Sequence, residues 1–244
     1  MRKMLSFPLA LLTLIVLGQT VVHGQTTQQG QIPAHSQNPA KDSTHRPDTV
    51  HRPDSTHARS DSTPWALYHS IEKTLDSVMD NDQSSRRMIE TIQKKYGMQS
   101  RQMDSLYEVM SIKDSIDLEK VTDILDKYGW LGIAEIGEKA NLAIFLVIQH
   151  SDSLTQVTYL PKMRQAVKEG KAKPDDLALL EDRVLCEQGK PQIYGSQVKV
   201  LKTGKYVFFP IQDERNVNKR RAAVGLSPLE EYAHYYGIDY HLPK

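Results

Sequence analysis

The chain has 244 residues, of which 25% are charged, and its formal net charge is +1. A length of this order accommodates one or two domains. The balanced charge gives no sign of the basic surface that nucleic-acid binding requires, so we expect no nucleic-acid partner.

Residues 1–24 have the pattern of a secretory signal peptide. Arg2 and Lys3 form a basic start, residues 5–17 an apolar run, and residues 22–24 a short approach to a cleavage site. The apolar run is shorter than the about 20 residues of a transmembrane helix, so we expect no membrane span after cleavage. An uncleaved anchor is the alternative. The prediction is export to the periplasm or the extracellular space.

The sequence contains a single cysteine, Cys186. One cysteine forms no intramolecular disulfide, so the exported fold must be stable by packing alone. Its neighbours Leu180, Val184 and Leu185 are apolar, which favours a small buried hydrophobe over a nucleophile.

Residues 25–63 are of low complexity, rich in Gln, Ser, Thr, His, Pro and Asp, and we predict a disordered spacer. His45, His51 and His57 recur every six residues, and weak metal binding is the alternative. The histidines beyond residue 63 lack metal-ligand spacing. We therefore predict no metal site and no cofactor.

Residues 64–127 show the three-and-four spacing of amphipathic helices. The pattern predicts helices over about 65–78, 82–95, 102–107 and 118–128. We interpret them as packing or partner-facing helices, with a coiled-coil seam as the alternative.

Residues 128–244 are predicted to form a compact helical domain with one hairpin. The apolar run 141–150 favours a buried helix over a strand. Further helices are expected over 152–167, from Pro174 to Gly189, after Asp213, and after a capping box at 227–230. A Thr-Gly-Lys turn between two apolar runs predicts a hairpin near 198–211. The fold class is mainly α with one small β-hairpin.

A series of motifs resembles the bacterial domain-of-unknown-function family 6624 over roughly residues 121–232. The motifs are GWLG (129–132), LVIQHSD (146–152), LALLEDRVL (177–185), GKPQIYGSQ (189–197), PIQDERNVNKRRAAVGL (210–226) and PLEEY (228–232). The resemblance implies boundaries for the domain but supplies no reaction.

Candidate catalytic groups follow the long apolar run. His150 could be a general base oriented by Asp152 if the backbone turns between them. The alternative is that Asp152 caps the next helix while His150 forms a local hydrogen bond. Arg183 could bind a carboxylate or an anionic ligand.

Candidate ligand-binding groups cluster in the turn that follows Gly189. Gln192, Tyr194 and Gln197 offer amide and phenol groups, and Arg220 offers a guanidinium. The alternative is that these groups satisfy the backbone of the loop, with an arginine anchored to Asp213 or Asp182.

The sequence contains no strong catalytic signature. We predict an exported protein that binds a small polar or anionic ligand, or an envelope protein, through the region of His150 and Tyr194. The alternative is an exported hydrolase or lyase with His150 as general base and an arginine that stabilises negative charge.

Overall fold

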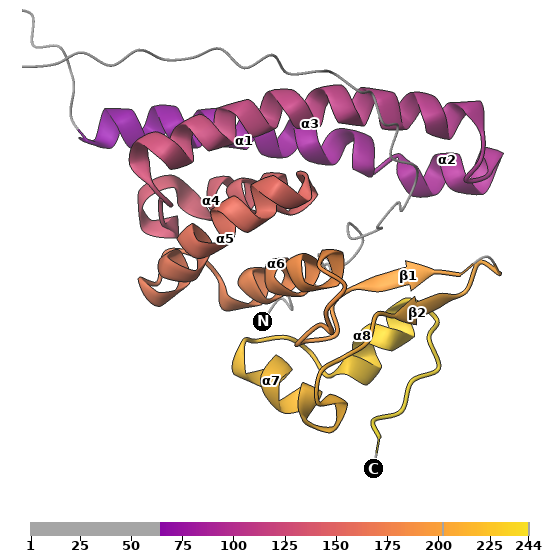
Figure 1. Ribbon diagram of the computed structural model, residues 1–244. Coiled ribbons are helices and arrows are strands. Elements are labelled where there is room, and N and C mark those ends of the chain that lie inside the picture. The colour runs from indigo at the N-terminus through magenta and orange to yellow at the C-terminus, as the bar shows by residue number, and fades with distance from the viewer. Residues whose placement is uncertain (1–63, 202, 244) are drawn as a thin grey trace, which may run out of the picture. The chain divides into compact units, whose positions relative to one another are not determined.

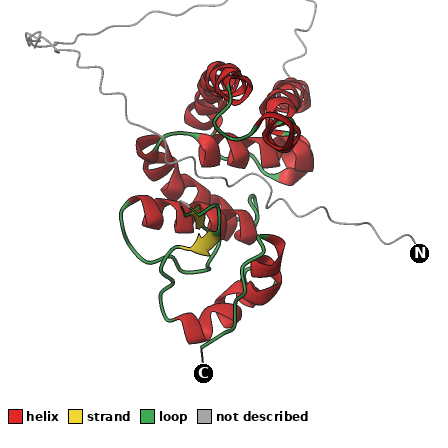
Figure 2. Cartoon of the chain, turned by 90° about the vertical axis from the view of Figure 1, so that its right-hand side faces the viewer, coloured by secondary structure: helices red, strands yellow, loops and turns green. Residues whose placement is uncertain are grey.

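Helices dominate the computed structural model, which describes residues 64–201 and 203–243 (Figures 1 and 2). The elements are α1 Pro64–Arg86, α2 Ile89–Tyr96, α3 Arg101–Tyr128, α4 Ile133–His150, α5 Ser153–Lys168, α6 Pro174–Glu187, β1 Val198–Val200, β2 Tyr206–Phe208, the 3-10 turn Glu214–Asn216, α7 Val217–Ala223 and α8 Leu229–Tyr235. This confirms a mainly α fold with one small hairpin. The predicted signal peptide, the spacer and its three histidines lie outside the described residues.

Helices α1 and α3 lie side by side and both pack against α4 (Figure 1). In α1, Ile71, Leu75 and Val78 repeat at helical spacing and are buried in the core. In α3, Val121 and Leu125 fill the same core from the other helix. This pair of helices therefore covers the face of α4 that carries the candidate histidine.

Helix α3 is one continuous helix of 28 residues, so the prediction of two shorter helices in this range was wrong. Neither Gly nor Pro occurs between Ser100, whose side chain caps the first turn, and Gly129, which ends the helix. The middle of α3 faces polar groups of α1, where Asn81 donates to Asp117. Because polar contacts take the place of an apolar stripe there, the sequence of this segment lacks the hydrophobic periodicity that predicts a helix.

Helix α4 is the central buried helix, as the apolar run 141–150 predicted. Its side chains from Ala143 to Gln149 are buried without exception. Gly137 has a φ of 77° and kinks the helix near its start. An ideal Cβ at this position would lie 3.2 Å from Oε1 of Glu72 on α1, so glycine suits both the backbone and the close approach.

Helices α5 and α6 pack against each other beneath α4. Asp152 caps α5, since its Oδ1 accepts the N–H of Thr155 at 2.8 Å. Pro174 opens α6, and Gly189 follows its end with a φ of 69°. The cap by Asp152 is one of the two roles considered for it from the sequence, and both ends of α6 agree with the prediction.

The C-terminal part contains the hairpin and two short helices. The strands are antiparallel, with Val198 opposite Phe208, as predicted. The predicted capping box at 227–230 was wrong, because no side-chain cap forms at Pro228. Instead, Oδ1 of Asn218 on α7 accepts the N–H of Leu229 at 2.8 Å. Within the described residues, no helix is both long and apolar enough to cross a membrane.

Candidate functional site

A cavity of about 390 Å³ lies where α1, α3 and the end of α4 meet. Its polar lining comes from three parts of the chain: Asp82 on α1; Tyr107, Ser111, Asp114 and Ser115 on α3; and His150, Ser151 and Asp152 at the end of α4 and just after it. Met110, Leu118 and Val147 give it an apolar wall. A small concave space with a few convergent polar groups is the usual form of a small-molecule site.

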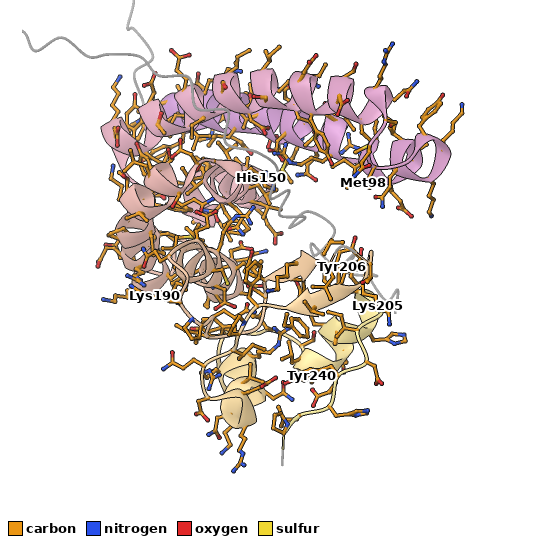
Figure 3. The ribbon with its side chains drawn as sticks, turned by 45° about the vertical axis from the view of Figure 1, so that its right-hand side comes forward. Met98, His150, Lys190, Lys205, Tyr206 and Tyr240 are labelled. Atoms are coloured by element: carbon orange, nitrogen blue, oxygen red, sulfur yellow. The ribbon has the colours of Figure 1, made fainter. Side chains whose placement is uncertain are left out.

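His150 is the last residue of α4, and Figure 3 shows it on the side facing the long helices. Its Nδ1 lies 3.0 Å from Oδ1 of Asp82, and the two side chains are 6% and 3% exposed. Burial lowers the pKa of the imidazole, and the nearby Asp82 carboxylate offsets only part of this effect. The neutral ring therefore donates from Nδ1 to Asp82, which leaves Nε2 as an acceptor.

The Nε2 atom of His150 is buried and has no hydrogen-bond partner among the described residues. The hydroxyl of Tyr107, which also lines the cavity, is in the same situation. Burial raises the pKa of Tyr107, so its hydroxyl keeps its proton at neutral pH. Buried polar atoms without partners cost free energy, about 1–3 kcal/mol each. Two residues that line one cavity therefore retain unused hydrogen-bonding capacity, which a ligand or ordered water reaches if the side chains that cover these atoms move.

Arg86 fixes the acidic wall of the cavity. Its guanidinium binds Asp82 at 2.8 Å and both oxygens of Asp114 at 2.9 Å. Burial alone would raise the pKa of Asp82, but the hydrogen bond from His150 and the charge of Arg86 hold the pKa below its ordinary value. Asp82 is therefore a carboxylate that orients the imidazole.

Asp182 organises the turn after α6, away from the cavity. Its Oδ1 accepts the N–H of Ile193 at 2.6 Å, and its Oδ2 accepts those of Tyr194 at 3.1 Å and Ser196 at 2.9 Å. Burial raises the pKa of Asp182, while the three N–H donors oppose the rise. This carboxylate folds the backbone of the turn.

Arg183 connects the turn to the end of α4. Its Nε donates to the carbonyl of Gln149 at 2.9 Å, and its Nη1 donates to Oε1 of Gln197 at 3.3 Å. No carboxylate of the described segments lies within ion-pair distance of Arg183. Both hydrogen bonds fix protein groups, and Arg183 does not line the cavity.

Gln192, Gln197 and Tyr194, predicted to contact a ligand, lie together in the turn but not at the cavity. Gln192 is fully buried and donates to the carbonyls of Gln197 and Phe209, both at 3.0 Å. Gln197 is equally buried and returns its N–H to Gln192 at 2.8 Å. Tyr194 contributes backbone groups to the same network.

Arg220 and its neighbour Arg221 hold the turn from the other side. Arg220 donates to the carbonyls of Ile193 and Asp213 and forms an ion pair of 3.5 Å with Asp213, the anchor considered from the sequence. Arg221 is 1% exposed and donates to the carbonyl of Tyr194 at 2.7 Å.

The structure thus brings His150 and Asp152 to the cavity, and groups the remaining candidates in a separate polar network. Asp152 lies beside His150 at the cavity but uses its Oδ1 to cap α5, and the partner of Nδ1 is Asp82. A second pair of buried amides, Gln149 and Gln156, also retains atoms without partners in this part of the chain. Cys186 is half-buried, and burial raises the pKa of its thiol to about 12, in agreement with a passive role.

The sequence did not single out Asp82, Arg86, Tyr107 or Asp114. They come from helices that the motif series did not reach, and Asp82 is 68 positions from His150. The signal that could have found two of them was the i,i+4 pair Asp82 and Arg86 on α1. Among the described residues, no group of three or more His, Cys, Asp or Glu side chains could hold a metal ion.

These features define a helical domain with a histidine–carboxylate pair in a small cavity. The chain belongs to a family of unknown function, DUF6624, whose model matches residues 70–243. The match includes most of α1 and all of α3, so Asp82 and Tyr107 lie inside the family's span. No curated protein and no solved structure matches the chain.

Proposed function

We propose that this protein binds a small polar molecule in the cavity between α1, α3 and the end of α4. The supporting observation is that His150 lines the cavity and that its buried Nε2 has no partner while Asp82 holds Nδ1. A ligand that donates a hydrogen bond to this atom would remove the cost of leaving it unpaired.

A screen of the chain against nucleotides, sugars, amino acids and metal ions, read as a shift in melting temperature, tests the proposal. The affinity of a ligand found in this way should fall roughly tenfold in His150→Gln, because the flexible amide does not hold its oxygen acceptor in the position of the imidazole Nε2. His69→Gln is the matched control, since His69 is a half-exposed histidine of α1 that does not line the cavity. A ligand whose affinity is unchanged in His150→Gln excludes this cavity as its site.

The turn that carries Tyr194, which was predicted as part of the binding region together with His150, is tested separately. Tyr194→Phe removes a hydroxyl from the turn and leaves its backbone contacts to Asp182 in place. A loss of affinity in this variant would assign the turn to the site, and unchanged affinity would restrict the site to the cavity.

A second candidate function is hydrolysis or elimination with His150 as general base. The specific observation in its favour is Asp82, which is placed to hold the imidazole and to stabilise the imidazolium formed when Nε2 accepts a proton. Arg86 is the guanidinium nearest to this pair, whereas Arg183 and Arg220 donate to carbonyl groups of the protein. Turnover of amide or phosphate esters that disappears in both His150→Gln and Asp82→Asn would establish this function.

We also propose that the protein is exported. The support is the basic, apolar and small-residue succession of residues 1–24. Amino-terminal sequencing of the mature protein from its natural cell should begin at Gln25. A mature chain that still begins at Met1 contradicts cleavage.

A further inference from the structure

Negative charge exceeds positive charge around the cavity. Asp82, Asp114 and Asp152 line it, and Arg86 binds the first two of these carboxylates. With His150 neutral, three carboxylates against one guanidinium leave an excess of two negative charges. An excess of one sign in a partly enclosed space attracts ligands of the opposite charge.

The neighbouring cationic side chains do not correct this excess within the cavity. Lys113 on α3 donates to the hydroxyls of Ser84 and Ser85, at 2.9 and 3.0 Å. Arg183 donates to the carbonyl of Gln149. Neither cation lines the cavity.

The groups with unused hydrogen-bonding capacity favour a donor-rich ligand. In neutral His150 the ring proton is on Nδ1, which donates a hydrogen bond to Asp82, so Nε2 accepts hydrogen bonds and does not donate them. The apolar wall of Met110, Leu118 and Val147 suits a hydrocarbon body. A volume of about 390 Å³ restricts that body to a small molecule.

We propose that the cavity binds a small organic cation, a protonated primary amine with a short apolar body. Its ammonium group lies in the field of Asp114 and Asp152 and donates to Nε2 of His150 after a small movement of the side chains that cover this atom. Its body packs against the apolar wall. This inference rests on the proposed function, because it specifies the chemical class of the ligand for the same cavity.

Three probes of one shape and different charge test the inference on the full chain. Benzylamine, benzyl alcohol and benzoate share a ring and differ in being cationic, neutral and anionic at pH 7. In ligand-detected NMR titrations, benzylamine should bind at least tenfold more tightly than benzyl alcohol, and benzoate should not bind. The affinity of benzylamine should fall as salt is raised from 20 to 300 mM, because screening weakens charge attraction.

Asp152→Asn separates charge from fold. Asparagine caps a helix as well as aspartate does, so α5 keeps its cap while the cavity loses one charge. Benzylamine should bind about threefold more weakly to this variant, and benzyl alcohol should bind as before. Asp239→Asn is the control with the same change in net charge, at a fully exposed carboxylate outside the cavity, and should bind benzylamine as the unaltered chain does.

Two results overturn the inference. If benzyl alcohol or benzoate binds as tightly as benzylamine, and His150→Gln weakens that binding, the cavity binds a ligand but does not select a cation. If no probe binds at 10 mM, the cationic class is wrong, and the broader screen with His150→Gln decides the proposed function on its own.

Discussion

At Asp182, three backbone N–H groups take the place of the cation that a buried carboxylate usually requires. Its side chain is fully buried, and it closes the turn that joins α6 to the hairpin. A charged acceptor satisfied by several N–H donors forms strong hydrogen bonds. Spacing in the sequence does not show that the partners of Asp182 are backbone groups of residues 193–196.

Asp182→Asn should destabilise the protein by about 3 kcal/mol. The amide presents an N–H₂ group to at least one backbone N–H, so donors face each other and a buried group loses its acceptor. Chemical denaturation measures the loss, and hydrogen exchange should show faster exchange at Ile193, Tyr194 and Ser196. Glu187→Gln, an exposed carboxylate on the same helix, is the control and should change stability by less than about 0.5 kcal/mol.

Asp176 makes stability depend on pH in a defined direction. Burial, with the charge of Asp175, raises the pKa of Asp176 from 3.8 in its ordinary state to about 7 in the folded chain. Between these values the folded state binds the proton more tightly than the unfolded state. The contribution of Asp176 to the free energy of unfolding is therefore fully present below pH 3.8 and is lost as pH rises through about 7.

Asp176→Asn should consequently stabilise the protein at pH 8, because it removes the cost of burying an ionised carboxylate. The expected gain is only about 2 kcal/mol, because the helix dipole at the start of α6 favours that negative charge and offsets part of the cost. At pH 4 the variant and the original chain should have nearly equal free energies of unfolding. Asp175→Asn, at the neighbouring half-buried position, is the comparison, and a difference of equal size at both pH values would contradict the linkage.

Among single residues, the sequence made His150 a candidate because it ends an unusually apolar run. Its partner Asp82 was not, because the charge-rich pattern of α1 gives every acidic residue the same appearance. Only the packing of α1 against α4 distinguishes Asp82 from the exposed Asp80, which pairs with Lys139. Long-range pairing of this kind has no signature in spacing.

At the level of elements, local rules predicted the helix ends where the cap is local. Asp152 and Pro174 act on their own helices, and the sequence identifies such positions. The start of α8 is different, because its cap comes from Asn218, eleven positions earlier on α7. The Ser-Pro-Leu-Glu pattern therefore predicted a helix at the correct position, but the predicted side-chain cap does not form.

Asn218→Ala should destabilise the chain by about 1 kcal/mol, the usual cost of a lost cap. Ser227→Ala should cost close to nothing, because the Ser227 contact to Arg221 uses the backbone carbonyl, which the substitution keeps. Thermal unfolding of the two variants compares the observed cap with the one predicted from the sequence. A larger loss in Ser227→Ala than in Asn218→Ala would contradict the observed arrangement.

For the whole molecule, the periodicity of the sequence predicted the helical class and the hairpin. It did not predict that the helices before and after residue 128 share one hydrophobic core. Residues 64–127 and 128–244 were predicted as separate stretches. In the structure, Leu75, Val78 and Val121 share one core with Ile144 and Ile148 of α4. The family match, from residue 70 onward, crosses the same boundary.

A chain that contains residues 128–244 alone should fail to fold cooperatively. Removal of α1 and α3 exposes the apolar face of α4, at a cost of about 25 cal/mol for each Å² left in water. Circular dichroism should show a broad thermal transition, and amide NMR signals should be poorly dispersed. A fragment of residues 62–244 is the control, and a sharp transition in the shorter fragment would contradict a shared core.

The chain of contacts from His150 through Asp82 and Arg86 to Asp114 has a further consequence for how a ligand can be discovered. It joins α4, α1 and α3, so the cavity exists only when all three helices are docked. A molecule that occupies the cavity binds only the folded state, so its binding free energy adds to the free energy of unfolding. At a concentration 100 times its dissociation constant, the gain is about 2.7 kcal/mol. Heat resistance can therefore identify the natural ligand from an unfractionated mixture of metabolites before any reaction is known.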